Sequence, residues 1–181
     1  GQQAIALQQH ANALALSLNT QGVAVGQSAP APSGGNGSRA VVWNGLMPTD
    51  LGTLGGQQSL AQGINDAGQI VGFSFLADGS LRATLWENGN IVNLGSGGNF
   101  SYATAINNKG QIVGSSTGPF NPRAYLWDHG TMTSIDPRGT GGDSIAYDIN
   151  EWGSIVGEYR NSAGVPQGFL WYLGQFYDLT D

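Results

Sequence analysis

Short apolar runs and small polar turns follow one another along the chain, and the same order of both recurs four times. In the second copy an alternating run ends at Asn65, an Asn-x-x-Gly turn follows, and Gln69–Gly72 begins a second run. Because Gly accepts the positive φ that a short hairpin requires, this turn predicts two antiparallel strands. A third run ends at Trp86, and a fourth carries Asn93 and Leu94. Each copy is therefore predicted to form four strands.

Two markers set the length of the repeat. The first is the Asn of the turn, at Asn19, Asn65, Asn107 and Asn150, with spacings of 46, 42 and 43 residues. The second is the Trp that ends the third run, at Trp43, Trp86, Trp127 and Trp171, with spacings of 43, 41 and 44 residues. Two independent markers with one period indicate a tandem repeat of roughly 43 residues. The predicted units are residues 8–52, 53–95, 96–136 and 137–181 of one repeat domain.

The first strand of each unit has small side chains at every second position, as at Ser59, Ala61 and Gly63. Since successive side chains of a strand point to opposite faces, one face of this strand is predicted to be small and the other large. A small face in every unit indicates strands that crowd one another, as the innermost strands around a propeller axis do. The second strand, with Ile70 and Val71, is apolar on both faces, which indicates a sheet covered on both sides. We therefore expect an all-β chain folded as a β-propeller of four-stranded blades, with a β-solenoid or part of a larger propeller as the alternative.

The N-terminal segment allows two interpretations. Gln2–Leu18 is rich in Ala, Leu and Gln, which are good helix formers. Aligned backwards from the first turn, however, Ile5 falls at the repeat position of Leu51, and this favours two strands. Residues 4–7 would then be a fifth copy of the outer strand. Because a bare edge strand promotes pairing with another chain, we expect this segment to support self-association by strand addition.

The second unit resembles a bacterial extracellular repeat. It contains Asp50–Ser59 (Asp-Leu-Gly-Thr-Leu-Gly-Gly-Gln-Gln-Ser), then Ile64-Asn65, Gly68–Gly72 (Gly-Gln-Ile-Val-Gly) and Ala83–Trp86 (Ala-Thr-Leu-Trp). This order is similar to the HAF family, although Arg82 stands where the family's tripeptide has His. The resemblance is strong in the second and third units and weaker in the first and fourth. It implies a secreted or cell-surface bacterial protein with a propeller-like fold, and it carries no catalytic motif.

Composition excludes several classes of partner and site. The net charge is −6 with only six Lys and Arg, which argues against binding nucleic acid. Cys is absent, and His10 and His129 fall in different units, so we expect neither a disulfide nor a Cys or His metal cluster. No apolar run reaches the length that spans a bilayer. No basic segment precedes an apolar one, so any signal peptide is expected to be absent from this chain or already removed. No cofactor is predicted.

Two motifs suggest chemistry, and each has a simpler interpretation. Gly114–Gly118 matches the G-x-S-x-G pattern, but that pattern needs a helix after its Ser, and Pro119 follows here. We therefore interpret it as a turn in a variable loop. Asp136, Asp143 and Asp148 surround a Gly-rich loop and could offer oxygen ligands to Ca²⁺. Their spacing matches no EF-hand loop and the other units lack them, so a solvated loop is favoured. No catalytic or metal site is predicted.

Aromatic residues are the remaining candidates for ligand contact, because aromatic faces suit the apolar faces of sugars. The four repeated Trp residues are predicted to pack in the core or between blades. The candidate ligand contacts lie outside the repeat pattern and are Phe100, Phe120, Trp152 and Tyr159. Asp50 and Asp178 recur at one repeat position, which favours a structural hydrogen bond over paired acid and base catalysis.

These observations predict a non-catalytic extracellular or cell-surface module with a structural or interaction role. The expected partner is a second copy of the chain, as a homo-oligomer or fibre, or else another surface protein or a glycan. A lectin-like propeller is the alternative. A glycan-acting hydrolase is less favoured, because no carboxylates converge on the non-repeating loops.

Overall fold

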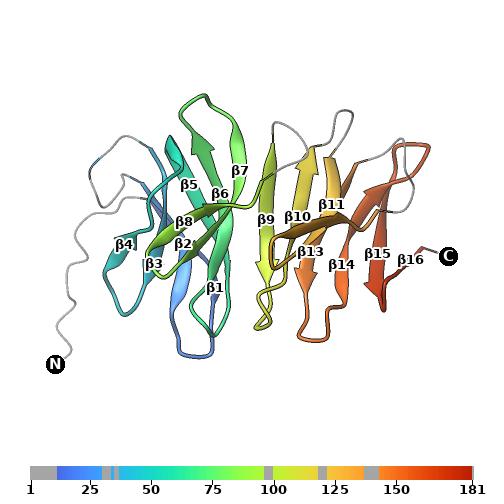
Figure 1. The fold of residues 1–181 in the computed structure, drawn as a ribbon, viewed down its shortest axis with the longest axis horizontal. Helices are drawn as coiled ribbons and strands as arrows, with labels where there is room; N and C mark the ends of the chain where they lie inside the picture. The colour runs from blue at the N-terminus through green and yellow to red at the C-terminus, as the bar shows by residue number, and fades with distance from the viewer. Residues whose placement is uncertain are drawn as a thin grey trace.

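The computed structural model describes residues 12–29, 34, 37–95, 100–117, 122–136 and 143–180. These residues form four antiparallel sheets of four consecutive strands, named blades 1 to 4 here (Figure 1). Blade 1 holds β1 (Asn12–Leu18), β2 (Ala24–Ala29), β3 (Arg39–Trp43) and β4 (Pro48–Asp50); blade 2 holds β5 (Gly55–Ile64), β6 (Ile70–Leu76), β7 (Leu81–Glu87) and β8 (Asn90–Asn93). Blade 3 holds β9 (Ser101–Ile106), β10 (Ile112–Thr117), β11 (Pro122–Asp128) and β12 (Thr131–Ser134); blade 4 holds β13 (Ser144–Ile149), β14 (Ile155–Arg160), β15 (Pro166–Tyr172) and β16 (Gln175–Asp178).

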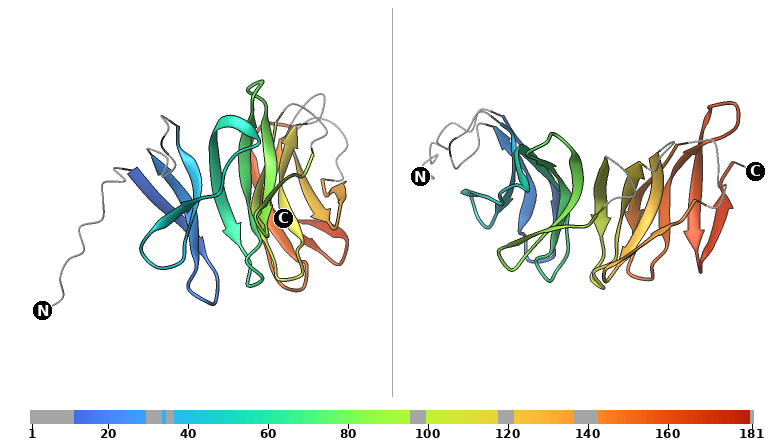
Figure 2. Two further views of the ribbon diagram at one scale, coloured as in Figure 1. Left: turned by 60° about the vertical axis from the view of Figure 1, so that its left-hand side comes forward. Right: turned by 45° about the horizontal axis from the view of Figure 1, so that its top comes forward.

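The blades follow one another in chain order, and each packs on the next. The first strands β1, β5, β9 and β13 contact one another in sequence, so they line one side of the row. Blades 1 and 4 lie at opposite ends of this row in Figure 1 and in the right view of Figure 2. The predicted all-β fold of four-stranded propeller blades is confirmed, and the described residues leave the ring open. They include no helix long and apolar enough to cross a membrane.

The turn after each first strand depends on its Asn. The Asn65 side-chain oxygen accepts hydrogen bonds from the backbone N–H groups of Ala67, at 3.1 Å, and Gln69, at 3.0 Å. Gly68 then takes a φ of +80°, which an L side chain rarely adopts. The Asn107 turn repeats this arrangement with Lys109 and Gln111. The hairpin predicted from Asn-x-x-Gly is therefore held by the Asn side chain as well as by the Gly backbone.

A β-bulge changes which side chains share a face. The pairing of β5 with β6 shifts between Ala61 and Gly63, and β1 and β13 carry the same shift. A bulge inserts a residue, so the strict alternation expected for the first strand is wrong beyond this point. Ile64 packs in the same cluster as Ala61, although alternation would put the two on opposite faces.

Residues 114–117 of the Gly114–Gly118 motif, which the structure describes, do not form a turn. Residues 114–117 continue β10 and pair with β9 on one side and β11 on the other. The Ser115 hydroxyl donates a 3.1 Å hydrogen bond to the carbonyl of Ser144 in blade 4. The interpretation as a turn is therefore wrong, because pairing on both sides extends the strand to Thr117. At the N-terminus, Asn12–Leu18 forms β1, whereas residues 4–7, the predicted extra strand, lie outside the described residues.

Candidate functional site

Each pair of consecutive blades shares one apolar interface. We call the side of a blade that packs on the following blade its forward face, and the side that packs on the preceding blade its rear face. The forward faces consist of Val25, Ala40, Val42 and Leu51 in blade 1, Val71, Ala83, Leu85 and Leu94 in blade 2, and Val113, Ala124, Leu126 and Ile135 in blade 3. The rear faces include Ala61, Ile64, Ile70 and Trp86 in blade 2, Ala103, Ile106, Ile112 and Trp127 in blade 3, and Ala146, Ile149, Ile155 and Trp171 in blade 4. One pattern of packing is thus used three times.

Two kinds of polar link repeat beside this packing. The side-chain amide of Asn19 donates to the carbonyl of Asn65 at 3.3 Å, Asn65 donates to Asn107 at 3.1 Å, and Asn107 donates to Asn150 at 3.0 Å. We call this series the Asn ladder. The second link is a buried Ser near the start of the first strand. The Ser101 hydroxyl accepts from the N–H of Ala83 at 3.0 Å, and Ser59 and Ser144 do the same for Ala40 and Ala124 at 3.0 and 2.9 Å. Both links tie one blade to the next.

The residue after the ladder Asn adds a third, exposed link. The Thr20 N–H and hydroxyl donate to Asp66 at 2.9 and 2.7 Å, and the Asp66 N–H donates to Asn108 at 2.8 Å. The Asn108 N–H donates in turn to Glu151 at 3.1 Å. The bonds from Thr20 hold the pKa of the Asp66 carboxyl below its ordinary value. Blades 2, 3 and 4 therefore each offer an acceptor at this position to the backbone of the blade before.

The two ends of the row show the same surfaces without a cover. On the rear face of blade 1, Leu18 is 70% exposed, whereas its counterpart Ile64 is 8% exposed. On the forward face of blade 4, Val156 is 44% exposed and Leu179 is 58% exposed. Their counterparts in blade 3, Val113 and Ile135, are 0% and 1% exposed. The end blades thus keep apolar side chains at interface positions that no other described blade covers.

Exposed apolar side chains concentrate in these two blades. Fifteen large hydrophobic residues are exposed among the described residues, and thirteen of them belong to blades 1 and 4 and their loops. The two in the middle blades are Val92 and Phe100. Apolar side chains exposed at positions that are buried between the other blades mark candidate interaction sites. The rear face of blade 1 and the forward face of blade 4, together called the end faces, are therefore the candidate site for a macromolecular partner.

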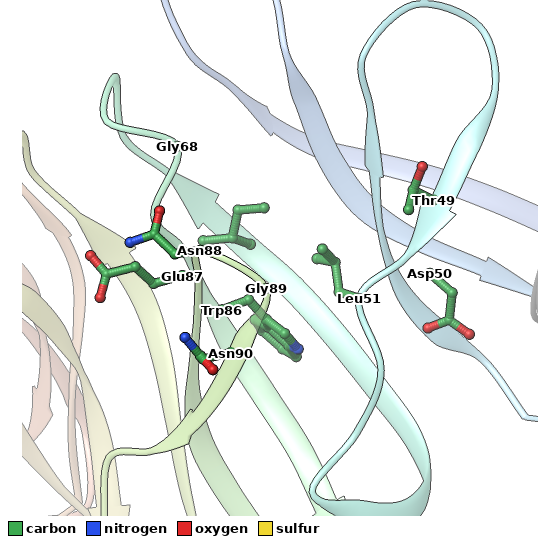
Figure 3. Close-up of a pocket in the computed structure, with 10 residues that line it drawn as sticks. Thr49, Asp50, Leu51, Gly68, Trp86, Glu87, Asn88, Gly89 and Asn90 are labelled. Atoms are coloured by element: carbon green, nitrogen blue, oxygen red, sulfur yellow. The ribbon is translucent and has the colours of Figure 1, made fainter.

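A smaller groove lies between blades 1 and 2. Figure 3 shows Thr49, Asp50 and Leu51 on one side and the segment Trp86–Asn90 on the other, around a space of about 270 Å³. The Trp86 ring is 4% exposed, so it offers no open face for stacking. Its indole Nε1 is buried and has no hydrogen-bond partner among the described residues.

The carboxylates at the repeated outer-strand position make local bonds. Asp50 lies 3.5 Å from Arg39 and accepts a 2.8 Å hydrogen bond from the N–H of Gly52. Asp178 accepts a hydrogen bond from the hydroxyl of Tyr159. These contacts hold the outer strand against its neighbours. The described residues contain no group of three or more His, Asp or Glu that could hold a metal ion.

The loop proposed for Ca²⁺ is described only at its edges. Asp136 is buried and its carboxylate lies 3.4 Å from Arg123, while the Gly-rich residues 137–142 fall outside the described part of the chain. The solvated-loop interpretation of this segment therefore stays a prediction.

The predicted aromatic contacts do not gather into one site. Phe100 is half exposed and precedes β9, whereas Trp152 is 84% exposed in the turn after β13, at the other end of the first strands. Tyr159 is buried, and its ring meets that of Phe176 edge-on at 5.5 Å. Phe120 lies outside the described residues. The repeated Trp residues pack between blades, except that Trp43 has no preceding blade among those described.

The comparisons with known proteins bear on the fold. No family model and no curated protein matches the chain. Among solved structures, the chain is similar to the β-propeller domain of the Trilobed protease from Pyrococcus furiosus, described as having an open velcro topology. The TM-score is 0.59 at 14% sequence identity, and the match covers 88% of this chain and 51% of that one. The chain therefore has a β-propeller fold and spans about half the length of the propeller domain that it matches.

Proposed function

We propose that this chain is a non-catalytic, extracellular interaction module that binds a protein partner through its end faces. The observation that carries the proposal is the exposure of Leu18, Val156 and Leu179 at positions that are buried or partly buried in every inner interface. Fully burying an exposed Val or Leu side chain contributes roughly 1.5–3 kcal/mol, so covering these side chains favours association with a partner. The resemblance to the HAF repeat supports an extracellular setting.

The non-catalytic part of the proposal rests on how the carboxylates are used. Asp50 and Asp136 pair with Arg side chains, and Asp178 binds Tyr159, so these acids already serve the blades. Paired acid and base chemistry needs two carboxyl groups facing one substrate. Propellers also occur beside enzymes, as in the matched protease domain. Hydrolysis of glycan or peptide substrates by the purified chain would contradict this part of the proposal.

Photo-crosslinking tests the binding surface directly. A photoreactive amino acid is placed at Leu18 or at Leu179, and the protein is expressed in its native bacterium. We expect a protein to be cross-linked from both positions, and the adduct to be found in the extracellular or cell-surface fraction. The matched control is the same amino acid at Leu173, which is 81% exposed in a turn away from the end faces. Cross-linking that is equal at Leu173, or absent from both end faces, would reject the proposed surface.

Glycan binding in the groove between blades 1 and 2 is the second candidate. It is favoured by the exposed polar side chains of Thr49, Asn88 and Asn90, which line the groove. The hydroxyl of Thr49 and the two amides could bind neighbouring hydroxyls of a sugar. A glycan array on the wild type and on Asn88→Ala and Asn90→Ala variants tests this function. Binding that is unchanged in both variants would place the glycan elsewhere.

A further inference from the structure

The uncovered surfaces at the two ends of the row resemble the two sides of an inner interface. The inner interfaces join Val, Ala and Leu or Ile of a forward face to Ala, Ile and Trp of a rear face. The forward face of blade 4 offers Val156, Leu170 and Leu179 at those positions. The rear face of blade 1 offers Ala15, Leu18 and Trp43. Each end therefore lacks the kind of surface that the other end presents.

The polar links stop at the same two places. The Asn150 side-chain oxygen closes its turn by accepting from Trp152 and Ser154, yet the described structure gives its amide no carbonyl in a further blade. The Asn19 carbonyl, at the other end, receives no ladder bond from a preceding described blade. The Thr20 hydroxyl occupies the acceptor position that Asp66, Asn108 and Glu151 fill in blades 2, 3 and 4. The ladder thus ends with a donor on blade 4, and the Asn19 carbonyl on blade 1 accepts, among the described residues, only the N–H of Gly22 in its own turn.

The chain cannot join its own ends in this arrangement, because blades 1 and 4 lie at opposite ends of the row (Figures 1 and 2). We propose that a second copy of this chain covers both end faces, with the forward face of blade 4 of each copy packed on the rear face of blade 1 of the other. This inference rests on the proposed function and names its partner. The junction is head-to-tail, so two copies form two identical junctions and close a ring.

The size of the matched propeller agrees with a ring of two chains. This chain covers 51% of that domain, so its four blades match about half of the length of a larger propeller. A second copy would supply the other half. A heterologous contact that failed to close would instead extend into a filament, which the mass of the assembly distinguishes.

One link of the inner interfaces is missing at the new junction. Blades 2, 3 and 4 have Ser59, Ser101 and Ser144 at the repeat position where blade 1 has Ala13. At the new junction the N–H of Gly168 would therefore find no Ser hydroxyl to accept its hydrogen bond. Leu18 also replaces the Ile of the inner rear faces. We therefore expect the two-chain ring to be less stable than the inner interfaces and to dissociate on dilution.

Light scattering on the full chain tests the proposal with two blocking variants. Leu18→Asp places a charge on the rear face of blade 1, and Leu179→Asp places one on the forward face of blade 4. Both residues are exposed in the single chain, so both variants should fold. We expect twice the single-chain mass of 18.8 kDa for the wild type and the single-chain mass for each variant alone.

Mixing the two variants gives the decisive result. The intact forward face of Leu18→Asp can dock on the intact rear face of Leu179→Asp, so the mixture should regain a species of twice the chain mass. One junction holds this species, whereas two hold the wild-type ring. On dilution, the mixed species should therefore dissociate while the wild-type ring is still assembled. Leu173→Asn is the matched control and should keep the wild-type mass.

Several outcomes would overturn the inference. They are a wild type of single-chain mass at all concentrations, blocking variants that remain paired, a mixture that stays single, or a mass that grows without limit. Loss of pairing on deletion of residues 1–8 would favour strand addition instead. Photo-crosslinks from Leu18 and Leu179 to a different protein would reject the second copy and leave the proposed function standing, whereas no protein cross-link would reject both.

Discussion

The side-chain amide of Asn107 donates a 3.0 Å hydrogen bond to the main-chain carbonyl of Asn150, one blade further along the chain. The oxygen of the same side chain accepts from the N–H groups of Lys109 and Gln111 and so closes the turn after β9. One Asn thus fixes its own hairpin and the position of the next blade. Because Asn65 is used in the same way, local turn formation and blade stacking depend on the same residues.

Replacing Asn107 by Asp separates these two roles. Asp keeps the oxygen that accepts from the N–H groups of Lys109 and Gln111 but loses the amide, which donates to the Asn150 carbonyl and to the Gln111 side-chain oxygen. We expect a loss of about 1–3 kcal/mol in the free energy of unfolding, because a buried side chain loses two hydrogen bonds. Asn150→Asp is the matched control: in the single chain, below the concentration at which two copies pair, its expected loss is under about 0.5 kcal/mol because its amide meets no further described blade. Urea denaturation of both variants measures the difference, and equal losses would contradict a structural role for the ladder.

The Gly that follows the Val of the second strand is required by crowding rather than by its φ. A Cβ on Gly72 would lie 1.9 Å from the carbonyl oxygen of Leu60, whereas a Cβ on Gly68 would meet nothing within 4 Å. Gly72→Ala should therefore cost at least about 3 kcal/mol, because the backbone of β5 must move. Gly68→Ala should cost about 1–2 kcal/mol for its positive φ alone. Thermal unfolding of the two variants tests this order, and a reversed order would refute it.

The sequence repeat predicted most of the strands, but it did not predict which side chains of the first strand share a face. The Asn and the Trp, Asn65 and Trp86 in the second unit, recur in every unit, and each lies within one residue of a strand end in the structure. Alternation failed at Ala61 and Gly63, because the pairing of β5 with β6 shifts its register between them. A period-two pattern contains no signal for an inserted residue. The extent of β10 was missed because pairing with β11 outweighs the turn propensity of Gly and Ser.

The sequence alone does not reveal the end faces, because their exposure depends on how the blades are arranged. Val156 and Leu18 look like ordinary core residues, because they stand in the same pattern as Val113 and Ile64. Their exposure follows from the open row of blades, which depends on the curvature between sheets and not on any one strand. The aromatic residues outside the repeat pattern do not form one site for a related reason. Phe100 and Trp152 flank opposite ends of the first strands, so their departure from the repeat does not bring them together.

The carboxyl of Asp66 should titrate below the ordinary Asp pKa, because the backbone N–H and the hydroxyl of Thr20 stabilise its charged form. A depressed pKa in the folded state adds stability above the unfolded value of 3.8, and this stability is lost as the pH falls through the folded value. Carbon-detected NMR titration of the side chain measures it. Thr20→Val removes the hydroxyl donor and keeps the N–H, so the pKa of Asp66 should rise towards 3.8. An unchanged pKa in this variant would assign the shift to other groups.

Leu173 adopts a backbone conformation that is unfavourable for Leu. Its φ is +50°, its side chain is exposed, and the equivalent turn of blade 2 holds Asn88 at a φ of +51°. Asn tolerates this backbone region better than Leu does, so Leu173→Asn should stabilise the chain by about 0.5–1 kcal/mol. A rise in the melting temperature with an unchanged assembly mass is the expected result. Leu173→Ala is the control, because it removes the apolar side chain without favouring the positive φ, and it should give no such rise.

Adding the missing Ser should strengthen the proposed junction. Ala13→Ser places a hydroxyl at the repeat position from which Ser101 accepts the N–H of Ala83, so the variant can accept from Gly168 of the second copy. A net gain of about 0.5–1.5 kcal/mol at each junction corresponds to a dissociation constant lowered roughly 2- to 10-fold per junction. Analytical ultracentrifugation of wild type and variant measures the change. The matched control is Ala15→Ser on the same strand, where the inner blades keep a buried Ala against the preceding Val, so this hydroxyl should weaken association. Two variants that differ only in the position of one hydroxyl should thus move the equilibrium in opposite directions, which non-specific apolar association would not produce.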